Sequence, residues 1–458
     1  MEKLTLREHL GYGAASLGDS ITYVFVGSFL MFFLTTVAHI APAQAGVISA
    51  LGAIASAVLN PILGYISDQV YTPLGRRRPA LLVFALPVAI SVTLLFTDLP
   101  LHGFIKTAYY GLMVVVFWFF YQGFFIPYNA LGAVYTNDYN DRTKLRLFAA
   151  MFNGLGNMIS LGVPAGLSAA LIAFGLSKGH AWMVVGGLLG LVSAASLLIT
   201  YSASKEKDPP CKRADGTKKA SFSFKRLFAE YVAVAKLPPV RWLIIASLTN
   251  LISYTMLNAD IVYYLTYCLS YPAGAVSLCL VLQTAMRTLL LIPTGKIAAR
   301  IDKRYVLILF NLAAVIGFII VRIIASPSIP AVIFFEFIVA VTTGTYWAIM
   351  PAIYYDVCDY DRLYSGKPRQ GTIVSFQGLV ESIATGAGSL LLGFILQLAG
   401  FDGSAAVQTA TALSWIHNCA TVVPALFLVI TCIAVFKYPI TRDAYEKIKQ
   451  QLAERDAG

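Results

Sequence analysis

The chain has 458 residues, of which 58% are hydrophobic and only 12% are charged, and its formal net charge is +11. Its mean hydropathy of +0.72 is far above that of soluble globular proteins. This composition excludes an ordinary soluble domain and indicates a protein that lies largely within a lipid bilayer.

Apolar stretches of about 20 residues recur along the chain. An α-helix rising about 1.5 Å per residue needs roughly 20 residues to cross a hydrocarbon core about 30 Å thick. The short alternating segments of a transmembrane β-barrel are not seen in the sequence. We therefore predict an all-α membrane protein with twelve transmembrane helices. The predicted spans are 11–39, 44–66, 79–98, 104–133, 147–174, 181–203, 240–268, 272–298, 305–325, 329–356, 371–400 and 414–437.

The positive charge is distributed on one side of these spans. They place 30 of the 34 lysines and arginines on a single face of the membrane. Basic residues accumulate in cytoplasmic loops, so both termini are expected in the cytoplasm. The charge is accordingly interpreted as a topological signal and not as a nucleic-acid-binding patch. We expect a multi-pass protein of the cytoplasmic membrane, surrounded by membrane lipid.

The least apolar stretch, 204–239, is interpreted as a cytoplasmic linker, and its second part, "FSFKRLFAEYVAVAK", is a candidate amphipathic helix on the inner leaflet. The linker separates an N-terminal six-helix half at 1–203 from a C-terminal six-helix half at 240–437. A cytoplasmic tail is expected at 438–458.

Weak internal repetition relates the two predicted halves. "NPILGYISDQVYTPLGRRRP" after span two corresponds to "LIPTGKIAARIDKRYVLI" after span eight, and "IPYNALGAVYTNDYNDR" after span four corresponds to "IMPAIYYDVCDYDR" after span ten. In each pair a proline-interrupted helix ends in a short charged turn. Two six-span halves of parallel topology are the arrangement of major-facilitator transporters, which bind substrate near the bilayer midplane.

The stretch "SDQVYTPLGRRRP" at 67–79 places an aspartate ahead of three consecutive arginines. That aspartate can accept charge-assisted hydrogen bonds from the arginines or from a helix N-terminus. Two interpretations stay open: a latch that closes the cytoplasmic side of the transporter, and charges that only fix topology. The similar charges at 300–304 favour the latch. The residues assigned to this cytoplasmic gate are Asp68, Arg76, Arg77, Arg78, Asp359 and Asp361.

"NPILGYISDQVYTPLGRRRP" resembles the loop signature of the glycoside-pentoside-hexuronide:cation symporters (melibiose-permease-like), a family of the major facilitator superfamily. Three further stretches are similar to family motifs: "YGAASLGD" near the N-terminus, "DVCDYDRLYSGKPRQG" between spans ten and eleven, and "KYPITRDAYEKI" after span twelve. The similarity covers the whole chain at matching positions. It implies a major-facilitator fold and the transport of a sugar-like solute by alternating access.

The resemblance also locates a cation site whose acidic ligands are replaced. The family's two aspartates on span two fall on Ser56 and Asn60, and its acidic residue on span four falls on Phe125. A family lysine on span eleven falls on Ser382. The joint replacement of the acids and the lysine is physically reasonable, because a buried lysine normally needs a nearby anion to balance its charge. The resemblance therefore predicts that sodium is not coupled at this site.

The same resemblance assigns substrate-binding residues to spans one and five. Asp19 falls at, or one residue from, the family's sugar-binding aspartate, and Ser20 is the strict register match. A carboxylate can accept hydrogen bonds from two sugar hydroxyls. Arg146 corresponds to a family arginine that approaches this aspartate, and its alternative role is an interfacial charge that fixes topology.

Glu381 lies near the middle of span eleven. Ionisable groups inside a span are costly and are functional hypotheses by default. Because desolvation disfavours a charged carboxylate, Glu381 is the first candidate for a proton carrier, and Asp19 is the second. Asp260 and Glu336 lie nearer the outer face and are expected to be interfacial. His417 is expected to be an interfacial histidine with satisfied hydrogen bonds.

Aromatic side chains on spans four, seven and ten offer surfaces on which a sugar can stack. Tyr128 and Trp347, beside the proline-broken stretches at Pro127 and Pro351, are the preferred candidates. No pattern indicates a metal site, a catalytic triad or a phosphate-binding glycine loop. We therefore expect no cofactor and no enzymatic activity.

Together these features predict a secondary active transporter of a sugar or glycoside, coupled to a proton rather than to sodium. Two alternatives within transport stay open: an uncoupled facilitator, and a carrier of another solute such as a lipid-like amphiphile. A non-transporting membrane sensor is the alternative from a different class. The ionisable groups retained at Asp19, Arg146 and Glu381 count against a sensor, which has no need to keep buried charges.

Overall fold

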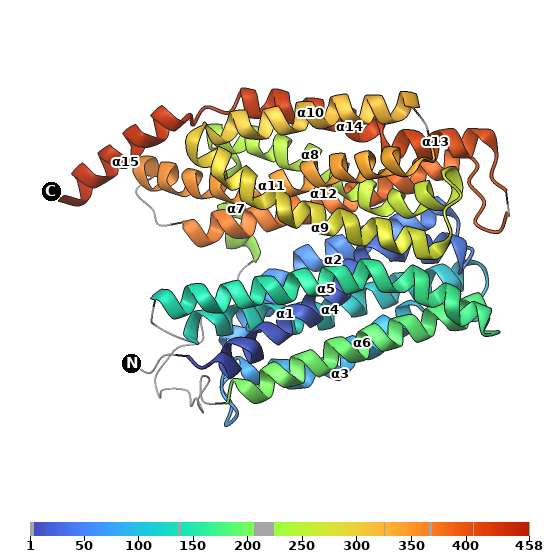
Figure 1. Ribbon diagram of the computed structural model, residues 1–458. Helices are drawn as coiled ribbons and strands as arrows, with labels where there is room; N and C mark the ends of the chain where they lie inside the picture. The colour runs from blue at the N-terminus through green and yellow to red at the C-terminus, as the bar shows by residue number, and fades with distance from the viewer. Residues whose placement is uncertain are drawn as a thin grey trace. The chain divides into compact units, whose positions relative to one another are not determined.

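The computed structural model describes residues 4–135, 139–205, 224–324, 326–365, 369–405 and 407–457, and leaves out the side chains of a few of these residues, Asp68 among them. Its regular structure is helical (Figure 1). Within the described ranges, twelve helical segments are long and apolar enough to cross a membrane. The predicted all-α fold with twelve transmembrane helices is confirmed.

The helices follow the predicted spans closely. The first six spans are α1 (Leu6–Thr36), α2 (Pro42–Asp68), α3 (Arg78–Leu95), α4 (Gly103–Val134), α5 (Tyr139–Ala173) and α6 (Lys178–Ala203). A short helix, α7 (Phe224–Ala235), precedes the other six. These are α8 (Pro238–Tyr263) with the π-helical turn η1 (Tyr264–Cys268), α9 (Ala273–Arg300), α10 (Lys303–Ile324), α11 (Ile329–Ser365), α12 (Gln370–Leu398), and α13 (Ala410–Ala420) with α14 (Val422–Phe436). A final helix, α15 (Arg442–Ala457), follows the last span.

Two spans differ from their predicted form. Span twelve, predicted as one helix, is broken at Thr421 into α13 and α14. Pro424 explains the break, because it has no N–H to donate to the carbonyl four residues earlier and its ring crowds that turn. Span ten continues as a helix to Ser365, nine residues beyond the predicted end at 356. The charged residues after position 355 lower the hydropathy and so end the predicted span, but they do not end the helix.

The chain forms two compact units: unit 1 comprises residues 1–222, 271–281 and 400–408, and unit 2 comprises residues 223–270, 282–399 and 409–458. In unit 1, α1 packs against α5 and α6, and α3 packs against α4 and α6. In unit 2, α8 packs against α12 and α14, and α10 packs against α11 and α14. The weak repeat in the sequence thus corresponds to a repeat in helix pairing. The boundaries of the two halves, 1–203 and 240–437, stay a prediction.

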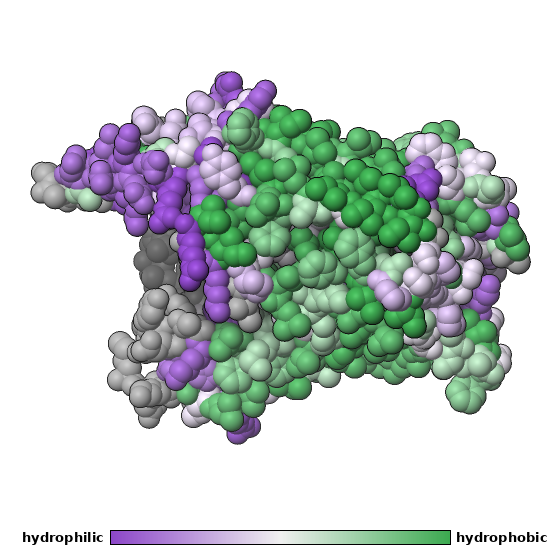
Figure 2. Space-filling view, turned by 45° about the horizontal axis from the view of Figure 1, so that its top comes forward, coloured by the Kyte–Doolittle hydropathy of each residue, from purple (hydrophilic) through white to green (hydrophobic). Residues whose placement is uncertain are grey.

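The exposed surface is typical of a membrane protein. Figure 2 shows hydrophobic residues covering the sides of the helices, while strongly hydrophilic residues gather at the end that carries the C-terminal helix. Large apolar side chains remain exposed along several spans, for example Leu86, Leu112 and Ile316. Contact with lipid tails accounts for such exposure. The chain is a multi-pass membrane protein.

Close packing of α1 against α5 depends on Gly156. A Cβ atom at this position would lie 2.7 Å from the Leu17 carbonyl oxygen and 2.7 Å from the Ser20 Cβ. Small residues permit such approach between transmembrane helices. Gly154, two residues earlier on the same helix, has nothing within 4 Å of an added Cβ.

We predict that Gly156→Ala destabilises the protein by about 1–3 kcal/mol, because the added methyl group forces α5 away from α1. Gly154→Ala should leave stability unchanged or raise it slightly, since alanine favours a helix over glycine. Thermal unfolding of both variants in detergent tests this expectation. Equal melting temperatures for the two variants would show that the α1–α5 contact is not close-packed.

Candidate functional site

Asp19 lies on α1 and faces α4. Its carboxyl is half-buried, and the Tyr121 hydroxyl donates a hydrogen bond to Oδ1 at 2.5 Å. Tyr121 is itself only 3% exposed, so its orientation is fixed by packing. A carboxylate has about four lone-pair sites, and one bond from Tyr121 leaves acceptor capacity for a ligand.

Tyr121, the partner of Asp19, belongs to a group of three packed aromatic rings. Trp118 lies edge-on to Tyr121 with the ring centroids 5.3 Å apart, and the Tyr23 ring is 5.8 Å from each of them. Tyr23 is 44% exposed, so the cluster has an accessible side. A polar acceptor framed by aromatic faces is a typical composition for a carbohydrate site. We call Asp19, Tyr23, Trp118 and Tyr121 the aromatic–carboxylate cluster.

Sequence reasoning missed Tyr23 and Trp118. Each lies one helical turn from a member of the Asp19–Tyr121 pair, since Tyr23 is four residues after Asp19 and Trp118 is three residues before Tyr121. That spacing was the available signal. Aromatic residues are too frequent in these spans for it to stand out.

Ser20 and Arg146 are not part of the cluster. Ser20 is 2% exposed and packs against Gly156 of α5, on a different side of α1 from Tyr121. Arg146 is exposed near the start of α5, and within the described residues no ion pair joins it to Asp19. The described partner of Asp19 is Tyr121, and the approach of Arg146 to this aspartate stays a prediction.

Tyr128, a predicted sugar ligand, has a structural contact on α1. Its hydroxyl donates to the Tyr12 carbonyl oxygen at 3.1 Å and lies 2.7 Å from the Ser16 hydroxyl. The Tyr128 ring stacks on Tyr12 at 4.9 Å. These contacts fix α4 against α1, two helical turns from Tyr121 on the same helix. Tyr128 therefore supports the geometry of the aromatic–carboxylate cluster.

The predicted degenerate cation site is electrically neutral. Gln122, buried on α4, donates from Nε2 to the Ser56 hydroxyl at 2.7 Å. Phe125 stacks on Tyr121 at 5.4 Å, and Asn60 is exposed on α2. Gln122 thus provides the polar partner of Ser56, a role that the sequence did not reveal.

Unit 2 holds the other two predicted transport residues. Glu381 is half-buried on α12 and accepts a hydrogen bond at 2.8 Å from Nε2 of Gln377, one turn earlier. Trp347 on α11 is 41% exposed and lies edge-on to the buried Tyr346 at 5.4 Å. Neither arrangement by itself tests the roles assigned to them.

The arginines of the 67–79 loop contact their own unit. The Arg78 guanidinium donates to the Tyr201 carbonyl oxygen at 2.6 Å and lies 4.1 Å above the Tyr201 ring. Arg77 donates to the Ser67 hydroxyl at 2.7 Å, and Arg76 lies over the Tyr71 ring at 5.4 Å. The Asp68 side chain lies outside the described residues, so the latch stays a prediction.

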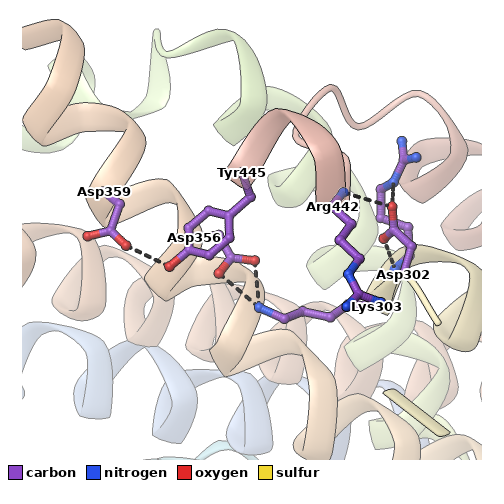
Figure 3. A network of polar contacts seen from close by, with 7 residues as sticks. Asp302, Lys303, Asp356, Asp359, Arg442 and Tyr445 are labelled. Atoms are coloured by element: carbon purple, nitrogen blue, oxygen red, sulfur yellow. Dashed lines mark hydrogen bonds and ion pairs between the residues drawn. The ribbon is translucent and has the colours of Figure 1, made fainter. Parts of the chain in front are cut away.

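Unit 2 carries a polar network that includes Asp359, one of the two other predicted gate residues. Figure 3 shows Lys303 paired with Asp356 at 2.7 Å, and the Tyr445 hydroxyl donating to Asp359 at 2.8 Å. Burial raises the pKa of the Tyr445 hydroxyl, and the neighbouring Asp359 carboxylate adds to this, so the hydroxyl stays protonated as the donor. Asp361 forms a bidentate pair with Arg369.

Asp302 completes this network at the α9–α10 turn. Its carboxylate accepts from the backbone N–H of Arg304 at 2.9 Å, which caps α10, and from the backbone N–H of Arg442 at 3.1 Å (Figure 3). Lys303 and Tyr445 lie within 5.5 Å of one another. The network therefore ties α15 to α11 and to the α9–α10 turn.

Three residues expected at the membrane interface are buried in the structure. Asp260 and Glu336 are 0% exposed, and His417 is 9% exposed. The sequence did not reveal this burial, because depth along a span does not show which face of the helix meets its neighbours, and the position near the outer face stays a prediction.

Comparison with known proteins assigns the chain to a family. The model of the MFS/sugar transport protein family matches residues 11–442. The chain belongs to the MFS/sugar transport protein family. It is a transporter and not an enzyme, and the predicted similarity to glycoside-pentoside-hexuronide symporters is confirmed.

Individual relatives are distant but cover nearly the full length. The uncharacterized symporter YnaJ of Bacillus subtilis is 24% identical, covering 100% of this chain and 96% of its own. The isoprimeverose transporter of Lactiplantibacillus pentosus is 23% identical over 95% of this chain and 89% of its own. The glucuronide carrier protein homolog of Escherichia coli is 23% identical over 99% of this chain and 97% of its own.

Solved structures confirm the fold of this sugar-transport family member. A bacterial homolog of the human lysosomal transporter Spinster, crystallised in an inward-facing and unoccupied conformation, has a TM-score of 0.70 at 14% sequence identity. The match covers 97% of each chain. At this identity the likeness shows the major-facilitator fold alone.

We predict that Tyr121→Phe raises the KM for transported sugar about tenfold, because a hydrogen bond to a charged group contributes about 1.5–3 kcal/mol. Initial uptake rates in proteoliposomes measure this change. Tyr110→Phe is the matched control, since its hydroxyl donates to the Thr97 carbonyl oxygen at 2.8 Å, elsewhere on α4. Unchanged KM values in Tyr121→Phe would remove Asp19 from the binding site.

Proposed function

We propose that this transporter carries a neutral glycoside or pentoside together with a proton across the cytoplasmic membrane, by alternating access. The observation that carries the proposal is the aromatic–carboxylate cluster, in which Asp19 keeps acceptor capacity beside three aromatic rings. The names of the relatives, an isoprimeverose transporter and a glucuronide carrier homolog, support a sugar-like substrate.

Charge favours a neutral sugar over a hexuronide. In the described part of unit 1, the partner of the Asp19 carboxylate is a neutral tyrosine and not a cation. A second carboxylate on the substrate would face Asp19 without a compensating charge, which is costly in a partly desolvated site. The first experiment is therefore uptake of labelled xylosides, hexosides and glucuronides into proteoliposomes. Saturable uptake of glucuronides alone would contradict the proposed substrate class.

The distribution of basic residues supports a cytoplasmic location for both termini and for the polar network of unit 2. Basic residues collect on that side of the spans, as the positive-inside rule requires. The network then lies at the cytoplasmic surface. In this orientation the α10–α11 connection and the start of α13 lie at the outer face.

We predict that a sodium gradient does not drive uptake, because Ser56, Asn60 and Phe125 supply no charge and Gln122 already bonds to Ser56. Uptake into proteoliposomes should be the same with sodium or choline outside, at fixed pH and membrane potential. A steep rise of the uptake rate with external sodium would contradict this prediction.

Glu381 is the proposed proton carrier, because its partner Gln377 is neutral and its carboxyl is partly accessible on α12. We predict that Glu381→Gln abolishes accumulation driven by a pH gradient while substrate exchange at equal pH persists, since exchange requires no net proton movement. Glu446→Gln, which alters an exposed acid on α15, is the control and should transport normally. Uphill accumulation by Glu381→Gln would transfer the proton role to another group, with Asp19 the next candidate.

A further inference from the structure

Three buried titratable side chains of unit 2 lack hydrogen-bond partners. Asp260 on α8 and Glu336 on α11 are both 0% exposed, and within the described part of the chain neither oxygen of either carboxyl group has a partner. His417 on α13 is 9% exposed, and its Nε2 is likewise unpaired there. Buried polar groups are nearly always hydrogen-bonded, so three exceptions in one region require an explanation.

Tyr264 is the point at which the three side chains meet. Its ring stacks on His417 at a centroid distance of 5.2 Å and contacts the Phe335 ring, next to Glu336, at 5.0 Å. Asp260 and Glu336 both lie within electrostatic range of its hydroxyl. Tyr264 also begins the π-helical turn η1, and such turns are frequent at functional sites.

Other charged or titratable groups come from the surrounding helices. Arg322 of α10 interacts electrostatically with Tyr264 and His417, and its Nε donates to the Asn418 side-chain oxygen at 3.0 Å. Cys268 of η1 and Cys419 of α13 lie within electrostatic range of Asp260. On α12, Glu381 is bonded to Gln377 of its own helix. The cluster therefore contains two acids, one histidine and one compensating arginine.

A surface pocket borders this cluster at Tyr264. It has a volume of about 290 Å³ and lies at the α10–α11 connection, which the charge distribution assigns to the outer face. Its lining includes Tyr264, Val321, Ser326, Ser328 and Phe335. Tyr264 therefore lines the pocket and also stacks on His417 of the cluster.

The chemistry of the cluster suits a proton better than a metal ion. Among the described residues, no group of three acidic, histidine or cysteine side chains is arranged to hold a metal. Arg322 already supplies a positive charge, which opposes the binding of a second fixed cation. A proton needs only one acceptor, and Asp260, Glu336 and His417 each provide one.

We propose that Asp260, Glu336 and His417 form a second proton-binding site of this transporter, which exchanges protons with the outer solution through the pocket above Tyr264. The site is separate from Glu381 and from the aromatic–carboxylate cluster. Proton binding here sets how uptake depends on external pH, and Glu381 remains the group proposed to couple proton to substrate. Of the two experiments that test this site, only the second, which measures uptake, rests on the proposed transport function.

The first experiment measures protonation directly. Infrared difference spectra of the purified wild-type protein, recorded between acidic and alkaline pH, should show the carbonyl band of buried carboxyl groups that gain protons. Asp260→Asn and Glu336→Gln should each remove part of this band, and Asp98→Asn should not, because Asp98 is an outer acid paired with Lys106 at 2.8 Å. A wild-type spectrum without a titrating buried carboxyl group would overturn the proposal, even if the variants failed to fold.

The second experiment measures uptake of the best substrate from the sugar panel as external pH is varied at fixed internal pH. The Asp260→Asn/Glu336→Gln variant should depend less on external pH than the wild type, because only Glu381 still takes up a proton, and should keep substrate exchange. An unchanged pH profile in this variant would overturn the proposed role. Wild-type uptake that does not change with the pH gradient, together with an infrared band that does titrate, would contradict proton-coupled transport. It would still support proton binding at this site. Loss of coupling in Glu381→Gln alone tests the proposed function independently.

Discussion

A hydrocarbon environment offers no hydrogen bonds, so polar side chains inside these helices depend on one another. Tyr121 satisfies Asp19, Gln122 satisfies Ser56, and Gln377 satisfies Glu381. In each pair a neutral donor serves an acceptor on the same or a neighbouring helix. At Asp19 and Glu381 the described partners are neutral, so they do not hold the carboxyl group in its charged form as an ion pair would.

This choice of neutral partners has mechanistic meaning. A carboxylate fixed by an arginine is a poor site for reversible protonation, because the positive charge stabilises the ionised form. Tyrosine and glutamine orient a carboxyl group while imposing a much weaker preference for either protonation state. The replacement of the family's acidic cation ligands by Ser56, Asn60 and Phe125 is consistent with this pattern, in which the described partners of the transport residues carry no charge.

The sequence predicted the architecture well because span length and hydropathy are local properties. It also identified Asp19 and Glu381, since an ionisable residue within an apolar run is conspicuous. It could not identify Tyr23, Trp118 or Gln122, whose roles depend on which helix faces surround Asp19 and Ser56. The burial of Asp260 and Glu336 was missed for the same reason: distance from the end of a span is visible in the sequence, but burial is decided by the helices packed alongside.

The network around Asp302 and Tyr445 gives the C-terminal helix a practical consequence. Because α15 is fixed to α11 through Asp359 and to the α9–α10 turn through Asp302, it projects from unit 2 as an ordered helix. A soluble domain fused in helical continuity with α15 would inherit this orientation. The fusion would supply a rigid marker outside the detergent micelle, by which electron microscopy could align a transporter whose own mass is almost entirely within the membrane.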